Sequence, residues 1–539
     1  MSEPDINNTI KIHSTSAGYG LAAATLIPSG AVILKISNPL LILLEKAHLA
    51  STCSWCFIKP EQPATLKSCA RCKVVGYCST DCQTDDWLAV HSKECKVLKA
   101  MPAIPPTATR GLIQLSLRNR SGDSQELVTH GKSLSPSRLE DLSLQAVVAA
   151  KYSRRRKEWL PTGLRVLCQM ETNAFRVTLP DDAPIGLCFD PIMALANHSC
   201  SPNAVVVFDG RTASFRALRE LKEGEEIFIS YIDPISTRDK RRQELQQRYF
   251  FECKCEKCTK DENAYETYLR AREEYSAPRR MAVLCDPLAN KTTAEICLHR
   301  YAQETRIPNM LQCINDAQGY LDQHLETTND LPPSARLDFL MNLCSGPSSG
   351  INAISPYPAV LHSLYLTFID MESWIPALIC LLSIALDSDP FTYPSPHHPV
   401  RIVRLFTLAK LITQIAGLTS NQFTLALTGL SREAAGAIED PLCELQYFGS
   451  FQVLIGIVAE EMGQAFGEGS RFAKEVVKEF ALAKNSEEMK QRKLGDAPVQ
   501  LGRWMMDRED EEGRKEAEKM VRGLRRLADC VEHVVGVPL

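Results

Sequence analysis

The sequence predicts an α+β protein in which a small-stranded β core is followed by an all-helical region. Short apolar runs separated by turn residues fill residues 9–44 and 186–231, which is typical of β structure. Beyond residue 263 the apolar residues recur at helical spacing. Two groups of cysteines, within residues 53–95 and 253–258, indicate that metal ions bind in the β part of the chain.

Length and composition limit the class of protein. The chain has 539 residues and a net charge of −4, so it can bury a core in roughly two to four domains. The balanced charge gives no reason to expect general binding to nucleic acid or an acidic membrane. The N-terminus lacks a basic segment and an apolar core, so no signal peptide is expected. The most apolar runs, 39–44 and 374–386, are shorter than the ~17 residues of a membrane span, which predicts a soluble protein of the cytoplasm, the nucleus or both.

The 20 cysteines are unevenly distributed along the chain. Seven lie between Cys53 and Cys95, and three between Cys253 and Cys258. In a long chain without a signal peptide, clustered Cys-x2-Cys pairs indicate zinc ligands rather than a disulfide framework. The scattered cysteines are predicted to be buried apolar residues, examples being Cys313, Cys380 and Cys443.

The first cysteine group has the ligand pattern of a double zinc site. Cys-x2-Cys occurs twice and is followed by Cys-x3-Cys and His-x3-Cys, which gives eight ligands, enough for two tetrahedral ions. Because so short a segment has little apolar core, metal binding is expected to drive its folding. Gly76-Tyr77-Cys78-Ser79 and Trp87-x3-His91 make the segment similar to a MYND zinc finger.

This resemblance implies two interleaved metal sites in the finger. It implies that the first ion is held by Cys53, Cys56, Cys78 and Cys82, and the second by Cys69, Cys72, His91 and Cys95. MYND fingers commonly bind proline-rich peptides. The alternative is that the finger only braces the rest of the protein.

The polar stretch 195–203, Leu-Ala-Asn-His-Ser-Cys-Ser-Pro-Asn, lies between apolar segments that are expected to be strands. A further expected strand at 226–230 ends in Tyr231, and Cys-x-Cys-x2-Cys follows at 253–258. This order of motifs resembles the second half of a SET-domain protein methyltransferase.

Two shorter motifs fit the same resemblance. Gly18-x-Gly20 stands where SET domains carry a glycine-containing turn, and glycine allows positive φ and close backbone approach to a ligand. Asn173-Ala-Phe175 precedes residues 186–191 in the order that the family shows. On its own, each motif would be interpreted as an ordinary turn or loop.

Together these motifs resemble the SET-and-MYND (SMYD) lysine methyltransferases, closely over residues 9–258 and loosely beyond. The resemblance implies direct methyl transfer from S-adenosylmethionine to a neutral lysine amine, in a protein with three structural zinc ions. It implies that Tyr231 is catalytic, that Phe175, Tyr231 and Tyr249 line the lysine channel, and that Cys200, Cys253, Cys255 and Cys258 hold the third zinc ion. The implied cofactor-binding residues are Ala17, Gly18, Tyr19, Gly20, Asn173, Asn197, His198, Tyr231, Tyr249 and Phe251.

The same resemblance divides the chain into domains. Trp374-x2-Ala377-Leu378 is similar to part of a tetratricopeptide (TPR) helix pair, which implies a TPR-like helical domain. The expected boundaries are 1–50 and 171–235 for the two parts of the SET domain, 51–97 for the MYND finger, 98–170 for a helical insert, 236–262 for the post-SET zinc segment, 263–480 for the TPR-like domain and 481–539 for a charged helical tail.

Two functions remain open at this point. The first is a methyltransferase acting on lysines of histone or non-histone proteins, and the second is an adaptor with a weak or inactive SET core. Ala17 favours the adaptor because related enzymes often carry a basic residue there, whereas Asn197, His198 and Tyr231 favour the enzyme. The expected partners are a protein substrate and a proline-rich peptide at the finger. A monomer without membrane association is expected.

Overall fold

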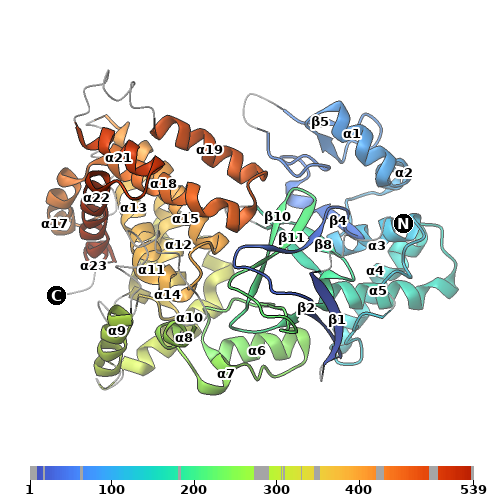
Figure 1. Cartoon of the computed structure of the whole chain (residues 1–539). Coiled ribbons are helices and arrows are strands. Elements are labelled where there is room, and N and C mark those ends of the chain that lie inside the picture. Colours follow the sequence, from blue (N-terminus) through green and yellow to red (C-terminus); the bar gives the residue numbers. More distant parts are fainter. Residues whose placement is uncertain are drawn as a thin grey trace. The chain divides into compact units, whose positions relative to one another are not determined.

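The computed structural model of the chain is shown in Figure 1. Ala17, which was predicted to bind the cofactor, lies outside the part that it describes. The chain forms two compact units, the first made of Met1–Ile232 and Arg242–Cys253, and the second of Asp233–Arg241 and Lys254–Leu539. The structure describes residues 9–15, 18–60, 65–124, 126–179, 184–271, 291–304, 306, 310–328, 331–344, 352–419, 430–484 and 496–535.

Small sheets form the β part of the first unit. Most strands are paired antiparallel, and the exception is the parallel pair β9–β12. The described sheets are β1 (Ile10–Thr15) with β2 (Gly18–Ala23); β10 (Ala204–Asp209), β11 (Thr212–Ala217) and β3 (Val32–Ile36); β4 (Leu41–Leu44), β8 (Pro184–Phe189) and β7 (Phe175–Thr178); β9 (Asn197–His198) with β12 (Phe228–Ile229); and β5 (Lys67–Ser68) with β6 (Gly76–Tyr77).

β10 and β11 form a hairpin at Asp209-Gly210, a dipeptide that favours a tight turn between strands. Asp209 pairs with Thr212, so the loop consists of Gly210 and Arg211. Gly210 has a φ of 60°, a conformation that glycine adopts without the steric cost of a side chain. A two-residue loop of this kind fixes the register of the two strands.

Most helices of the first unit lie in the zinc-finger segment and in the insert that follows it. Ser79 caps the first of them, because its Oγ accepts a hydrogen bond from the Cys82 amide at 3.1 Å. The helices are η1 (Lys46–His48), α1 (Thr80–Asp86), η2 (Trp87–His91), α2 (Ser92–Ala100), α3 (Thr107–Leu117), α4 (Pro136–Tyr152), η3 (Lys157–Trp159), α5 (Leu160–Asn173) and η4 (Met193–Leu195). Helix α6 (Arg238–Tyr249) follows the last strand.

The zinc-finger segment shares its apolar core with the neighbouring sheet. Phe57 and Tyr77 of the finger belong to the same buried cluster as Leu34 of β3 and Phe215 of β11. Arg211, in the β10–β11 loop, places its guanidinium 4.2 Å from the centroid of the Trp55 ring, within cation–π range. The finger is therefore packed onto the β core, as the bracing alternative requires.

All the regular secondary structure that the structure describes in the second unit is helical. Its first helices are α7 (Glu256–Lys260), α8 (Ala264–Ala271), α9 (Lys291–Glu304), α10 (Met310–Thr328), α11 (Pro333–Cys344), α12 (Tyr357–Asp370) and α13 (Trp374–Ser383). The later ones are η6 (Ile384–Ser388), α14 (Asp389–Thr392), α15 (Pro399–Ala416), α17 (Arg432–Glu444), α18 (Tyr447–Phe466), α19 (Arg471–Ala483), α21 (Asp496–Met506), α22 (Glu511–Asp529) and α23 (Val531–Val535).

Helix α13 lies at the centre of this helical unit. Every residue from Ile375 to Ser383 is buried, and the helix packs against α12, α15 and α22 (Figure 1). A helix that is apolar all round belongs inside a folded domain. Among the scattered cysteines, Cys380 of α13 is buried as predicted, but Cys443 is exposed, so that prediction was wrong. The side chain of Cys313 lies outside the described residues.

One described helical stretch is long and apolar enough to cross a membrane, judged by length and composition. It runs over 19 residues, Trp374–Thr392, so the prediction that this run is too short was wrong. The same stretch is 89% buried inside the protein, as is usual for a core helix. Its last turns carry Asp387 and Asp389, which form ion pairs with Arg525 and Arg404. A second candidate exists only if α17 and α18 are counted as one span across a 76° bend.

Candidate active site and metal clusters

The stretch 195–203 is held against the strand that leads to Tyr231. In the parallel pair, Phe228 of β12 lies opposite Asn197 of β9, and Ile229 lies opposite His198. Asn203 fastens the other end of the stretch, because its Oδ1 accepts from the Phe228 amide at 2.8 Å. Its Nδ2 donates to the Glu226 carbonyl, also at 2.8 Å. Two segments separated by about thirty residues thus form one rigid surface.

Tyr231 is fixed at both ends by hydrogen bonds. Its backbone amide donates to Nδ1 of His198 at 3.0 Å, and its hydroxyl donates to the Ala196 carbonyl at 2.7 Å. Burial raises the pKa of Tyr231, and the neighbouring Tyr249 and Glu226 raise it further. The side chain is therefore a neutral phenol at physiological pH, with an oxygen lone pair that its own donated bond does not use.

Aromatic residues from the end of α6 pack around Tyr231. The Tyr249 ring centroid lies 4.8 Å from that of Tyr231, and its hydroxyl donates to the Tyr231 carbonyl at 3.3 Å. Phe251 lies 5.9 Å from the His198 ring. Phe250 between them has a φ of 59°, a left-handed conformation that is uncommon for a residue with a side chain. The reversal of the backbone at Phe250 brings both flanking aromatic side chains to the same site.

Asn197 connects this surface to the early glycine motif. Its Nδ2 donates to Oε1 of Glu226 at 2.8 Å and to the carbonyl of Tyr19 at 3.4 Å. A Cβ atom on Gly20 would lie 2.8 Å from both Asn197 Nδ2 and Glu226 Oε1, so a larger residue there would force these two side chains to shift. Gly18 has a φ of 117° and open space where a Cβ atom would stand.

Glu226 is the residue of this site that sequence reasoning missed. The sequence places it at the start of the expected strand 226–230 and gives its side chain no role. In the structure it lies two residues before β12, in an isolated bridge with Ala22. The signal that the sequence offers is a carboxylate five residues before Tyr231.

Two predicted site residues are not joined to this surface by any described contact. Asn173, at the end of α5, donates through Nδ2 to the carbonyls of Val128 at 2.9 Å and Gln169 at 2.8 Å. The Phe175 ring packs edge-on against Phe215, with centroids 6.3 Å apart. Within the described part of the chain, neither residue forms a hydrogen bond or ring contact with Asn197 or Tyr231. Their assigned roles stay predictions.

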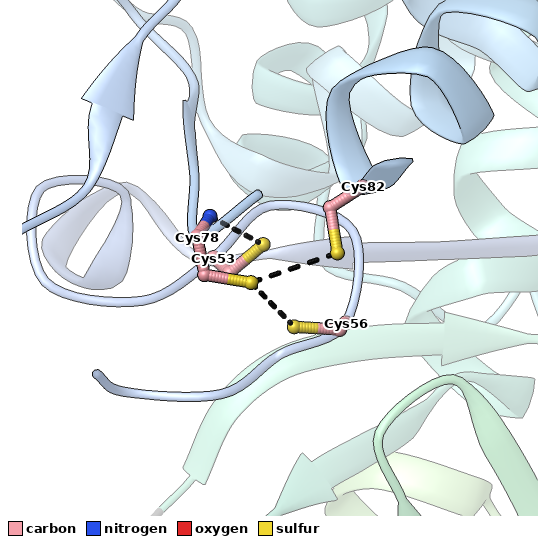
Figure 2. Close-up of side chains that lie close together, drawn as sticks. All are labelled: Cys53, Cys56, Cys78 and Cys82. Atoms are coloured by element: carbon pink, nitrogen blue, oxygen red, sulfur yellow. Dashed lines mark hydrogen bonds between the residues drawn. The ribbon is translucent and has the colours of Figure 1, made fainter. Parts of the chain in front are cut away.

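Three groups of cysteine and histidine side chains converge as the family resemblance implies. In each group the four ligand atoms lie within 4.8 Å of one another. Figure 2 shows the most exposed group, in which Cys78 approaches Cys56 and Cys82. The groups are Cys53, Cys56, Cys78 and Cys82; Cys69, Cys72, His91 and Cys95; and Cys200, Cys253, Cys255 and Cys258.

The distances within these groups fit tetrahedral zinc. Four sulfurs at 2.3 Å from one ion stand about 3.8 Å apart. Cys78 Sγ lies 3.5 Å from Cys56 Sγ and 3.6 Å from Cys82 Sγ, and Cys200 Sγ lies 3.9 Å from Cys253 Sγ. Disulfide sulfurs would be about 2 Å apart. The chemistry and spacing of the donors therefore fit three zinc ions.

A buried carboxylate supports the histidine of the second group. His91 turns Nε2 toward Cys69 and Cys72, at 3.3 and 3.6 Å, and Nδ1 toward Glu94 Oε2 at 3.6 Å. Burial alone would raise the pKa of Glu94, but Arg110, whose Nε lies 2.7 Å away, together with His91 and Gln114, lowers it to about 2. The Glu94 carboxylate thus lies within ion-pair distance of His91, on the side of the ring opposite the two cysteine sulfurs, but beyond hydrogen-bond distance.

His198 links Tyr231 to the third metal cluster. Its Nδ1 accepts from the Tyr231 amide, so in the neutral ring Nε2 carries the proton, and Nε2 lies 3.2 Å from Cys200 Sγ. His198 therefore lies beside the third metal cluster without being one of its four ligands.

Comparison with known proteins finds SET-domain and MYND-type relatives of this chain. A family model for the SET domain matches residues 18–232. "SET domain and MYND-type zinc finger protein 6" of Schizosaccharomyces pombe is 33% identical over 256 residues, which cover 46% of this chain and 52% of that protein. The human "Histone-lysine N-methyltransferase SMYD3" is 30% identical over 276 residues, 47% of this chain and 62% of the relative.

A further relative is "N-lysine methyltransferase SMYD2" of Gallus gallus, 29% identical over 255 residues, 45% of this chain and 57% of the relative. The chain thus spans between 52% and 62% of the length of these three proteins. A solved structure titled "Crystal structure of the SET domain of LSMT bound to Lysine and AdoHcy" aligns over 89% of this chain and 88% of that one, at 12% identity and a TM-score of 0.23, too low to support an inference.

Proposed function

We propose that this chain, a member of the SET- and MYND-type protein family, is an S-adenosylmethionine-dependent protein-lysine N-methyltransferase. The observation that carries the proposal is the parallel pairing of β9 with β12, which joins Asn197, His198 and Tyr231 in one site. The substrate would be a lysine side chain of a histone or non-histone protein.

The Asn197 surface suits the proposed cofactor. S-adenosylmethionine supplies an electrophilic methyl group on a sulfonium centre, next to an amino-acid tail with a cationic amine. The Nδ2 atom of Asn197 is engaged by Glu226 and Tyr19, so Oδ1 is the atom able to accept from such an amine. Gly18 and Gly20 keep side chains away from the neighbouring backbone.

Tyr231 would act as an orienting group rather than a general base. A phenol whose pKa lies above its ordinary value keeps its proton at neutral pH and removes none from an incoming lysine ammonium. Its hydroxyl is directed by the Ala196 carbonyl, which fixes the remaining lone pair in space. Rate enhancement would then come chiefly from alignment and exclusion of water.

The aromatic pair Tyr231 and Tyr249 suits the proposed lysine channel. The two rings are tilted by 38° to each other, and aromatic faces attract an approaching ammonium through cation–π interaction and exclude water from the reacting centre. Phe175 is proposed to contribute a further wall. The third zinc cluster would hold the tail that carries Phe251 close to His198, so this zinc ion would be structural but needed for activity.

The proposal also covers the binding partner of the finger, the oligomeric state and the location in the cell. The exposed Trp87 and Leu88 of the finger offer apolar surface for a proline-rich peptide. A monomer in the cytoplasm, the nucleus or both is proposed from composition. The adaptor alternative rested on Ala17, which lies outside the described residues.

The test uses the full-length zinc protein with radiolabelled S-adenosylmethionine and a cell extract. Tyr231→Phe removes the hydroxyl that donates to Ala196, and we expect transfer to fall on the order of 100-fold while cofactor binding persists. The matched control is Tyr447→Phe in the helical unit, which also removes a hydroxyl and should leave transfer unchanged. Cofactor binding without labelled protein in the wild type would support the adaptor instead.

A further inference from the structure

The side-chain amide of Asn197 has only one orientation that satisfies its neighbours. The Glu226 carboxylate and the Tyr19 carbonyl both accept hydrogen bonds, so the atom that faces them must be Nδ2. Rotating the amide by 180° would place Oδ1 2.8 Å from a carboxylate oxygen, which is electrostatically unfavourable. Glu226 therefore decides which end of Asn197 is available to a ligand.

Glu226 is itself held in place by several contacts. Its backbone pairs with Ala22 in an isolated antiparallel bridge, and its carbonyl accepts from Nδ2 of Asn203 at 2.8 Å. Its side chain is only 22% exposed, and Nε2 of His13 lies 4.0 Å from Oε1 on the β1 side. A carboxylate with this backbone support and little solvent is a fixed acceptor rather than a mobile surface charge.

Gly20 leaves the room that this arrangement needs. Any side chain at that position would begin 2.8 Å from both members of the Asn197–Glu226 pair and force them apart. β2, which carries Gly20, therefore leaves room for the hydrogen bond between Nδ2 of Asn197, in β9, and Oε1 of Glu226, in the loop before β12.

We propose that Glu226 is a positioning residue that sets Oδ1 of Asn197 as an acceptor and so makes the cofactor site select for the cationic amine of its ligand. The proposal rests on the proposed function. The hydrogen bond to Glu226 occupies Nδ2 and leaves Oδ1 as the acceptor atom of the Asn197 amide. An acceptor suits the cationic amine of the cofactor tail, which donates hydrogen bonds, and does not suit its carboxylate.

The experiment compares three probes by calorimetric titration with the full-length zinc protein. The probes are S-adenosylhomocysteine, its deaminated analogue and its decarboxylated analogue. In the wild type, loss of the amine should weaken binding about tenfold or more, the scale of a hydrogen bond to a charged group, whereas loss of the carboxylate should weaken it less.

Glu226→Gln should reduce the wild-type preference for the amine-bearing probe, because a glutamine amide also satisfies the flipped Asn197. Glu225→Gln is the matched control: Glu225 is the adjacent carboxylate, bonded to Arg219 and the Lys222 amide instead of Asn197. That variant should keep the preference. Gly20→Ala, which pushes the pair apart without removing charge, should act like Glu226→Gln if the latter does not fold.

The outcomes separate this inference from the proposed function. If Glu226→Gln and Gly20→Ala fold, bind S-adenosylhomocysteine and discriminate as the wild type does, the positioning role is wrong. Equal weakening by both analogues in the wild type would also overturn it. If the wild type binds none of the three probes, the proposed function itself fails.

Discussion

Strands of two to six residues build the β part of the first unit, whereas the second unit contains helices of up to 20 residues. The first unit distributes its buried residues over separate clusters, one of which includes the zinc-finger segment. The second unit gathers most of its buried residues into one cluster centred on α13 and extending to α22. We infer from this difference that the metal clusters stabilise the short strands and loops around them, whereas the long apolar helices are stabilised by the surface that they bury.

Removing zinc should have the largest effect, and it should be confined to the region of the metal clusters. A structural zinc site contributes on the order of 10 kcal/mol to folding, more than most small domains have in reserve. After treatment with a strong zinc chelator, we expect hydrogen exchange to accelerate across residues 51–97 and 195–203. Peptides from α13, α15 and α18 should retain their protection.

Restoring zinc to the chelated protein is the control, and it should return the lost protection. Equal loss of protection in these peptides would contradict the comparison, because it would mean that the core helices α13, α15 and α18 also depend on the metal ions.

A cavity in the apolar core should affect the second unit alone. Leu378 of α13 is fully buried, and truncation to alanine should lower the free energy of unfolding by about 2–5 kcal/mol. Leu366→Ala on α12 is the control, since that side chain is 46% exposed and should cost less than about 0.5 kcal/mol. Urea denaturation followed by circular dichroism measures both, and metal analysis should find the zinc content unchanged. A variant that loses zinc would show that the units are energetically coupled.

The smallest predicted effect depends on pH and also belongs to the second unit. Burial raises the pKa of Glu461 from 4.5 to about 7, with repulsion from Glu460 adding to the shift and Arg401 opposing it. Nδ1 of His397 lies 4.0 Å from its carboxylate. Because the folded state holds this proton more tightly than the unfolded state, stability should decrease as pH rises from about 4.5 to 7, by up to about 3 kcal/mol.

Glu461→Gln should remove that pH dependence and raise the melting temperature at pH 8, with little effect near pH 4.5. Glu439→Gln, an exposed carboxylate on α17, is the control and should leave the profile unchanged. Identical pH profiles for Glu461→Gln and the wild type would argue that Glu461 is ionised without cost.

Local features of the fold could be predicted from the sequence, and long-range pairings could not. Zinc ligands can be found in the sequence because pairs of them come from one turn of the chain and so have a fixed spacing. The hairpin at Asp209-Gly210 depends on two loop residues that are adjacent in the sequence. The Asn197–Glu226 bond and the stacking of Arg211 on Trp55 join residues far apart in the chain. No local pattern encodes such contacts, since the sequence around one partner does not identify the other. The family resemblance supplied Tyr231 but not its support by Ala196 and His198.

The shared core under the zinc finger has a practical consequence for anyone who dissects this protein. Phe57, Val75 and Tyr77 fill the same interior as Ile33 and Phe215, so excising residues 51–97 would leave a hole beneath the β10–β11–β3 sheet. If the truncated protein lacked the proposed activity, a disrupted β core would explain the loss as well as a missing binding surface would. Substitutions at the exposed Trp87 or Leu88 are therefore the better test of the proposed peptide binding by the finger.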